Sequence, residues 1–202
     1  MSAAVIVSPL ATAPAPEPRR PRVLFIAAAF GAVASGIFVL SMLAAYLQLR
    51  GERLAAGVNA LPDGAVLPLT PGNMGLLTLA MSAITMAWIV YSLRVGDRTH
   101  AYLGLGVTIL LGVAFINSTV YLYQQLAVGF TASGTSALLY AVTGAHIVMV
   151  VVGLVFTAVM GFQALGGQLA GRDAEGMSAA ALYWYVTIAV YVAVWYGVYI
   201  TK

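Results

Sequence analysis

The chain has 202 residues, of which 62% are hydrophobic and 7% charged, and its formal net charge is +3. Because soluble domains carry about 25% charged residues, this composition excludes an ordinary soluble protein and indicates a membrane protein. The sequence contains no cysteine, which excludes disulfides, thiolate metal sites and a cysteine nucleophile.

The first segment, residues 1–22, is rich in proline and ends in the basic run "RRPR". Proline favours extended segments with few internal contacts. The segment differs from a signal peptide because its apolar core is short and its arginines follow that core instead of preceding it. We therefore expect residues 1–22 to form a flexible cytoplasmic arm.

The remaining residues, 23–202, alternate between apolar stretches and short charged clusters. A transmembrane helix needs about 20 apolar residues, and the nearly uncharged stretch 99–171 is long enough for two such helices. It breaks at the polar, small-residue segment "GFTASGTSA" (129–137). We therefore predict an all-α, polytopic membrane protein, a bundle of five transmembrane helices at about 23–48, 72–93, 101–126, 137–161 and 179–201.

The distribution of basic residues predicts the orientation of the helices. Cytoplasmic loops of membrane proteins carry an excess of lysine and arginine. One side of the predicted bundle receives Arg19, Arg20, Arg22, Arg94, Arg98 and Arg172, whereas the other receives only Arg50, Arg53 and Lys202. We expect the N-terminus in the cytoplasm and the C-terminus outside.

The helix predicted at 23–48 carries small residues at every fourth position: Ala27, Gly31 and Ser35. Residues at this spacing lie on one face, and small side chains let two helix backbones approach closely. We expect Gly31 to be a packing residue of the subunit and Ser35 to make a polar contact between helices.

The helix predicted at 101–126 is the most polar of the five, and Asn117 lies deep within it. An unpaired amide at that depth is costly, so we expect Asn117 to bond a neighbouring helix. A substrate-binding role for this amide is the alternative.

The helix predicted at 179–201 is rich in aromatic residues. Trp184, Tyr191 and Trp195 share one face. We expect that face to pack on a partner subunit, because aromatic belts and packing account for such residues without a cofactor.

One histidine, His146, stands near the middle of the apolar run "YAVTGAHIVMVVVG" (140–153). The other histidine, His100, lies at the cytoplasmic start of the helix predicted at 101–126, far from His146 along the membrane normal. A metal site needs several ligands close together, so we do not expect His146 to bind a metal. A proton pathway would need several ionisable groups in series. We therefore expect a neutral imidazole that donates one hydrogen bond and accepts another between helices.

The same run resembles a segment of subunit III of haem–copper cytochrome oxidases that usually reads Thr-Gly-x-His-x-x-His-Val-x-x-Gly. Thr143, Gly144, His146 and Gly153 match, whereas Met149 replaces the second histidine. We expect Thr143 to make a polar contact between helices and Gly153 to be a packing residue of the subunit. The closing "LYWYVTIAVYVAVW" is similar to that family's Tyr-Trp-His-Phe-Val-Asp-x-Val-Trp ending. Tyr183 and Trp184 match there, and Tyr185, Ile188 and Tyr191 replace the histidine, the aspartate and the final tryptophan.

Partial matches continue in the other helices, so that the resemblance covers about residues 23–202. Ser82 and Thr85 fit a Leu-x-x-Ser-Ser-x-Thr stretch of the family. The buried glutamates of the family fall on Ser35 and near Leu122, which do not ionise. Roles that the family assigns to those acids in lipid binding and proton uptake are therefore not carried over to this chain.

The resemblance implies an accessory, non-catalytic subunit III of a respiratory haem–copper oxidase in a bacterial cytoplasmic membrane. It would pack on the catalytic subunit and hold lipid between its helices. It would bind no haem or copper of its own, because these would belong to subunits I and II, and cytochrome c would be the electron donor. We expect no nucleic-acid partner.

Three alternatives remain. The same type of subunit also serves quinol oxidases and accompanies some nitric oxide reductases. A small transporter would be expected to show polar groups along a path or inverted repeats, and neither stands out here. A membrane enzyme would need a nucleophile with its base or a metal cluster; one histidine among serines and threonines does not predict catalytic residues.

Overall fold

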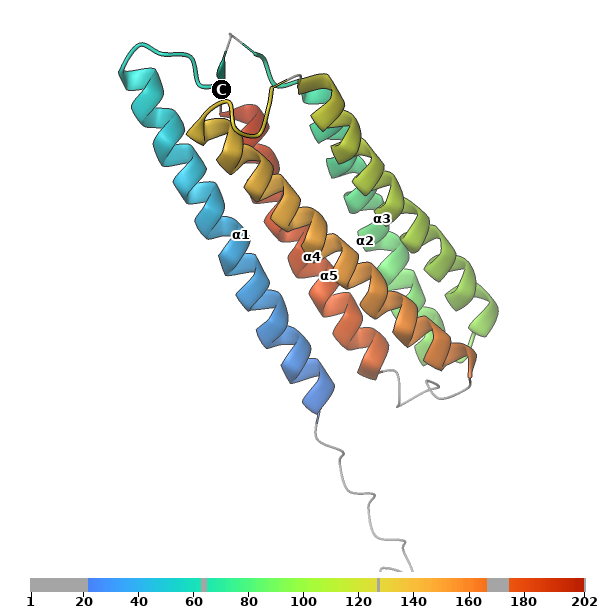
Figure 1. The fold of residues 1–202 in the computed structure, drawn as a ribbon. Helices are drawn as coiled ribbons and strands as arrows, with labels where there is room; N and C mark the ends of the chain where they lie inside the picture. The colour runs from blue at the N-terminus through green and yellow to red at the C-terminus, as the bar shows by residue number, and fades with distance from the viewer. Residues whose placement is uncertain (1–21, 63–64, 127, 167–174, 202) are drawn as a thin grey trace, which may run out of the picture.

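The computed structural model describes residues 22–62, 65–126, 128–166 and 175–201. Residues 1–21, where we expect a flexible arm, lie outside the described residues. The described chain is all-α and holds the five helices α1 (Val23–Ala55), α2 (Leu69–Arg94), α3 (Arg98–Leu126), α4 (Gly134–Leu165) and α5 (Glu175–Trp195), and α5 continues into a π-helical turn, η4 (Tyr196–Ile200) (Figure 1). All five helices are long and apolar enough to cross a membrane, which confirms the predicted fold class.

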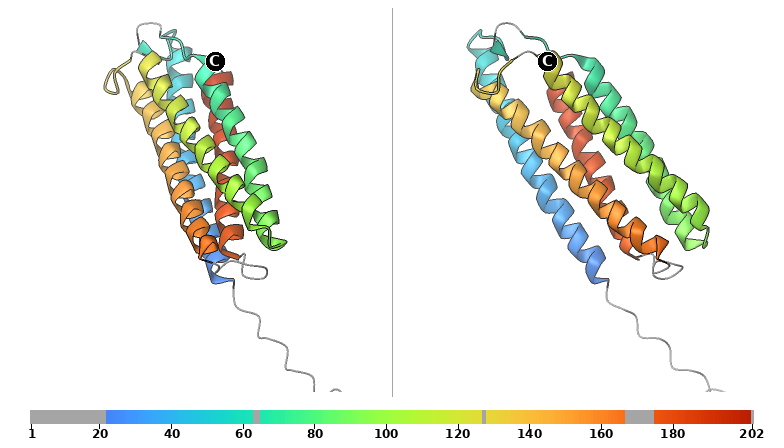
Figure 2. Two further views of the ribbon diagram at one scale, coloured as in Figure 1. Left: turned by 90° about the vertical axis from the view of Figure 1, so that its right-hand side faces the viewer. Right: turned by 45° about the vertical axis from the view of Figure 1, so that its right-hand side comes forward.

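Helices α4 and α5 lie between α1 and the pair formed by α2 and α3 (Figures 1 and 2). Helix α1 packs on α4 and α5, whereas α2 packs on α3 and α5. One cluster of buried side chains, including Val39, Leu139 and Val194, fills the space between α1, α4 and α5. A second, including Leu79 and Phe115, fills the space between α2, α3, α4 and α5. Helix α5 therefore contacts α1, α2 and α4, while Tyr185 and Val192 on its remaining face stay exposed.

The helices extend beyond the predicted apolar spans. Helix α1, predicted to end at about residue 48, continues to Ala55. The residues after Arg50, "GERLA", include good helix formers, so the charges mark where the apolar span ends and not where the helix ends. Helix α4 begins at Gly134, inside the predicted break, because Ser133 and Ser136 form a capping box at its first turn.

The turn between α2 and α3 is built from the "RVGDR" segment (94–98). Gly96 has a φ of 80°, a left-handed conformation that favours glycine. The Asp97 carboxylate accepts a hydrogen bond from the backbone N–H of His100 at 3.1 Å and so caps the first turn of α3. This hydrogen bond is the largest cause that lowers the pKa of Asp97. The cap therefore stays charged at pH values below those at which a free aspartate becomes protonated.

Candidate functional site: the central cluster

Buried polar contacts join α2, α4 and α5 halfway along the bundle. One joins His146 on α4 to the backbone of α5, and another joins Trp184 on α5 to Ser82 on α2. We call these residues and the rings around them the central cluster: Ser82, Phe115, His146, Trp184, Thr187 and Tyr191.

His146 on α4 has 1% of its surface exposed, and its Nε2 lies 3.0 Å from the backbone oxygen of Thr187 on α5. A carbonyl oxygen only accepts hydrogen bonds, so Nε2 carries the hydrogen and donates it. Nδ1 is then an acceptor, and it is buried without a hydrogen-bond partner among the described residues. The structure thus shows one of the two hydrogen bonds that we expect for this imidazole.

Aromatic rings enclose His146. The ring centroid of Phe115 lies 5.3 Å from that of His146, edge to face, and the centroid of Tyr191 lies at 5.1 Å. Tyr191 also meets Phe115 edge to face at 4.8 Å, and its hydroxyl donates to the backbone oxygen of Gly72 at 3.0 Å. The imidazole therefore helps to pack α3, α4 and α5 together.

Trp184 on α5 is fully buried, and its indole N–H donates to the hydroxyl oxygen of Ser82 on α2 at 2.9 Å. The Ser82 hydroxyl in turn donates to Leu79 of its own helix at 2.7 Å. A β-carbon added at Gly153 of α4 would lie 2.8 Å from Cε3 of Trp184. Only a glycine at 153 leaves room for the indole in this position.

Two of the three aromatic residues of α5 that we expected to pack on a partner subunit lie inside this chain instead. Trp184 and Tyr191 are buried inside this chain, and Trp195 is half-buried, with its N–H donating to the side-chain oxygen of Asn73 at 2.9 Å. The reason is the position of α5, which has other helices on several sides. Gly153 likewise packs within the chain, against Trp184.

The small-residue face of α1 is also placed differently from our expectation. Gly31 is exposed, and a β-carbon there would meet nothing within 4 Å. The buried small residues lie one position further along the helix, at Ala28, Ala32 and Gly36. The Ser35 hydroxyl donates to the backbone of its own helix, at Gly31, and makes no described contact between helices.

Thr143 on α4 and Asn117 on α3 are the other two residues for which we predicted polar contacts between helices. Thr143 makes an interhelical contact, because the hydroxyls of Thr143 and Tyr123 lie 2.7 Å apart. Asn117 is exposed, contrary to our expectation, since the buried face of α3 runs through Phe115 and Thr119. Its neighbour Ser118 bonds α2 instead, through the backbone oxygen of Pro71 at 2.9 Å.

Sequence reasoning did not single out Tyr123 or Ser118. Ser118 could have been found as the hydroxyl next to Asn117 in the sequence. Tyr123 could have been found as a hydroxyl one helical turn before the end of the predicted span. In the described part of the chain, no group of at least three His, Cys, Asp or Glu residues could hold a metal ion. The chemistry of the central cluster is hydrogen bonding and ring packing.

Replacing His146 separates the need for volume from the need for an imidazole. His146→Ala should lower the free energy of unfolding by about 2–5 kcal/mol, because it leaves a cavity beside Phe115 and Tyr191. His146→Leu should change it by less than about 1.5 kcal/mol, because leucine fills the space and removes the unpartnered Nδ1. Denaturant unfolding of the detergent-solubilised variants measures both; equal losses would show that the imidazole itself is required.

The comparisons with known proteins agree with this arrangement. The sequence model of the family described as "Cytochrome c oxidase subunit III" matches residues 23–202, which include all five helices. The chain belongs to the cytochrome c oxidase subunit III family. The family match begins where α1 begins and leaves out the expected arm.

Curated subunit III proteins show how far the similarity extends. The chain is 31% identical over 126 residues to "Probable cytochrome c oxidase subunit 3" of Rickettsia conorii, an alignment that covers 61% of this chain and 44% of the relative. It is 28% identical over 141 residues to the Bos taurus protein (68% of this chain, 54% of the relative). It is 27% identical over 143 residues to the Strongylocentrotus purpuratus protein (69% and 55%). The chain spans about half the length of the subunit III relatives that it matches.

Proposed function

We propose that this chain is an accessory, non-catalytic subunit III of a respiratory haem–copper oxidase. It would pack on and stabilise the catalytic subunit and hold lipid between its helices. Haem and copper would be held by partner subunits I and II, and cytochrome c would reduce the complex. The observation that carries this proposal is the family match over the whole of residues 23–202.

The orientation and location form part of the proposal. The excess of arginine on one side of the bundle supports an N-terminus in the cytoplasm and a C-terminus outside a bacterial cytoplasmic membrane. Arg94 and Arg98 flank the turn that would then face the cytoplasm, whereas Arg50 and Arg53 lie towards the opposite end of α1. Residues 1–22 would form the cytoplasmic arm.

The internal contacts support a packing role. His146 and Trp184, which match motif positions of the family, tie α4 and α5 to each other and to α2. A scaffold needs such contacts, because the separate helices must present one fixed surface to a partner. The exposed side chains of the bundle then remain available for other subunits and for lipid.

The subunit proposal is tested by purifying the tagged full chain from its membrane in mild detergent and identifying the proteins that accompany it. We expect the two large oxidase subunits in a fixed ratio to the tagged chain. Oxygen uptake with reduced cytochrome c, compared with uptake driven by a quinol, decides whether the complex is a cytochrome c or a quinol oxidase. A nitric oxide reductase would reduce nitric oxide with the same preparation. A tagged chain that leaves the membrane alone would contradict the proposal.

The exposed small-residue face of α1 is a surface for a partner subunit. Gly31→Leu should leave the chain at least as stable as wild type, with a gain of up to about 1 kcal/mol, because leucine favours helix more than glycine does and nothing in the chain lies within 4 Å of the added β-carbon. It should reduce the fraction of the chain recovered with the oxidase subunits. Gly106→Leu on α3 is the matched control, because Gly106 is exposed and equally free of neighbours. Equal recovery of both variants would show that the Gly31 face makes no subunit contact.

A further inference from the structure

Asn117 places an amide on the outside of the bundle at membrane depth. Its side chain is exposed, and it makes no hydrogen bond to the described residues. Helix α3 has 29 residues and spans about 43 Å, so it exceeds the hydrocarbon core of about 30 Å by roughly 7 Å at each end. Asn117 lies about 13 Å before the end of α3 at Leu126. The amide therefore lies within the hydrocarbon region.

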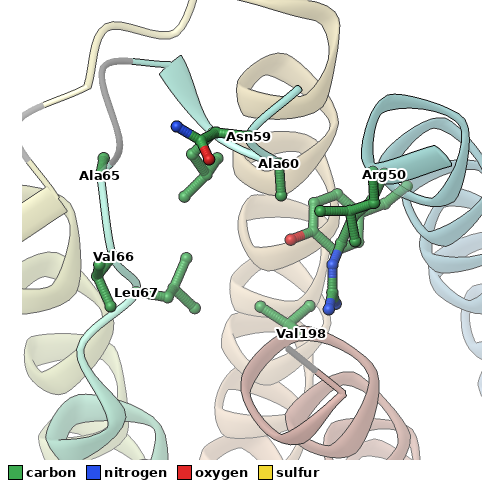
Figure 3. Close-up of a pocket in the computed structure, with 10 residues that line it drawn as sticks. Arg50, Asn59, Ala60, Ala65, Val66, Leu67 and Val198 are labelled. Carbon is green, nitrogen blue, oxygen red and sulfur yellow. The ribbon is translucent and has the colours of Figure 1, made fainter. Parts of the chain in front are cut away.

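Several polar side chains elsewhere in the spans find their partners inside this chain. Arg50, which lines the pocket at the end of α1, reaches towards η4 (Figure 3) and donates to the backbone oxygen of Gly197 at 3.3 Å. It also bonds Thr201 and Tyr46. The exposed hydroxyl of Ser41 donates to the backbone of its own helix at 2.8 Å. Asn117 differs from these residues, because its donors and its acceptor face outwards.

An amide that faces acyl chains finds no partner among them, because lipid tails neither donate nor accept hydrogen bonds. The side chain of asparagine is also too short to reach the headgroups, unlike that of lysine or arginine. Asparagine in a membrane helix instead forms hydrogen bonds to another helix. The exposed amide therefore indicates that a helix from outside this chain covers α3 at the depth of Asn117.

The residues that share a face with Asn117 are exposed as well. We call this set the exposed face of α3: Leu110, Val113, Asn117, Val120 and Gln124. Any exposed helix face shows intervals of three and four residues, so the side chains themselves are the informative feature. Valine alternating with leucine at these intervals favours pairs of parallel helices, in which one polar residue such as asparagine fixes the register.

The exposed face of α3 lies at an edge of the bundle. Helix α3 packs on α2 and α4, and the pair of α2 and α3 forms the edge opposite α1 (Figures 1 and 2). The surface around Gly31, proposed above for an oxidase subunit, belongs to α1. A partner on α3 therefore leaves the surface around Gly31 free.

We infer that two copies of this chain pair through the exposed face of α3, with their Asn117 amides hydrogen-bonded to each other. An amide both donates and accepts, so Asn117 is complementary to itself. Two copies inserted in one orientation are related by a two-fold axis along the membrane normal, which places both amides at the same depth. The inference goes beyond the proposed function and does not depend on it.

Cysteine cross-linking in the native membrane tests the pairing. The chain contains no cysteine, so one introduced cysteine reports on one position. Val113→Cys in the tagged full chain, oxidised with iodine, should give a disulfide-linked dimer, because a disulfide needs Cα atoms within about 7 Å of each other. Val148→Cys near the middle of α4 is the matched control, because Val148 is 62% exposed and Val113 54%. It should stay monomeric on a non-reducing gel.

The part played by the amide is tested by adding Asn117→Leu to the Val113→Cys chain. Asn117 is exposed, so leucine should not prevent folding. As the purified complex is diluted with added lipid, the association constant should fall at least about threefold, the effect of losing one hydrogen bond between membrane helices. Asn117→Gln should restore part of the association. Gln163→Leu, which removes an exposed amide from α4, should leave it unchanged.

Three results would overturn the inference. The first is a Val113→Cys chain that stays monomeric or that dimerises no more than Val148→Cys. The second is an unchanged association constant in Asn117→Leu. The third is a cross-link to a different protein from a benzophenone attached at Val113→Cys, which would assign the exposed face of α3 to that protein. Recovery of the oxidase subunits is measured separately, so failure here leaves the proposed function standing.

Discussion

Trp184→Ala should lower the free energy of unfolding of the chain by about 3–5 kcal/mol, the range found when a buried aromatic side chain is replaced by alanine. The indole is fully buried in the cluster between α2, α3, α4 and α5. Its removal leaves a cavity against Gly153 and leaves the Ser82 hydroxyl without its donor. Neighbouring helices cannot close such a space without giving up contacts elsewhere.

Denaturant unfolding of the detergent-solubilised chain measures this loss. Trp88→Ala is the matched control, because Trp88 on α2 is 38% exposed and should cost less than about 1 kcal/mol. Trp184→Phe keeps most of the volume and removes the N–H, so it should cost about 1–3 kcal/mol. A loss for Trp184→Ala no larger than that for Trp88→Ala would contradict the position of the indole inside the bundle.

Gly153→Ala should destabilise the chain by about 1–3 kcal/mol, the usual cost of overpacking a tight interior. The added β-carbon would lie 2.8 Å from Cε3 and 3.1 Å from Cζ3 of Trp184. Both atoms belong to a rigid, buried ring, so α4 and α5 have to move apart. Gly106→Ala should instead stabilise α3 by up to about 1 kcal/mol, because alanine favours helix and nothing lies within 4 Å of the new carbon.

The double variant Gly153→Ala with Trp184→Leu provides the decisive comparison. If the clash with the indole causes the loss, the alanine should cost much less once leucine replaces Trp184. The two changes then show a coupling energy of about 0.5–3 kcal/mol, as expected for residues in contact. Additive losses would contradict a direct contact between residues 153 and 184.

The number and order of the helices could be predicted because charged residues interrupt the apolar stretches at the membrane surfaces. The bounds were less predictable, since a helix does not end where the bilayer ends. Helix α1 continues from Arg50 to Ala55, outside the apolar span. Gly57, with a φ of 72°, lies just after its end.

Which face of each helix lies inside the bundle was harder to predict than the number of helices. In lipid, a face that meets acyl chains and a face that meets another helix are both apolar. The sequence therefore does not show whether Trp184 and Tyr191 lie inside the chain or against a partner, and the structure buries both. Helix α1 has small residues on adjacent faces, so the exposed Gly31 and the buried Ala32 are indistinguishable by pattern.

The partner of each polar side chain was also difficult to predict from the sequence. A hydroxyl or amide in a membrane helix needs a partner, but the sequence does not say which helix supplies it. His146 could be assigned to an interhelical bond because a buried imidazole has few alternatives, and its acceptor at Thr187 required the structure. Asn117 and Ser118 are adjacent in the sequence but lie on different faces of α3. The structure shows that Ser118 is the one that faces α2.

The visible spectrum of the purified assembly tests the central claim most directly, namely that this chain packs against a catalytic partner and holds no prosthetic group of its own. We predict haem bands and copper in the complex recovered with the tagged chain, and neither in the chain after it is separated from its partners. Haem or copper that stays with the separated chain, and that is lost in His146→Ala, would contradict the claim.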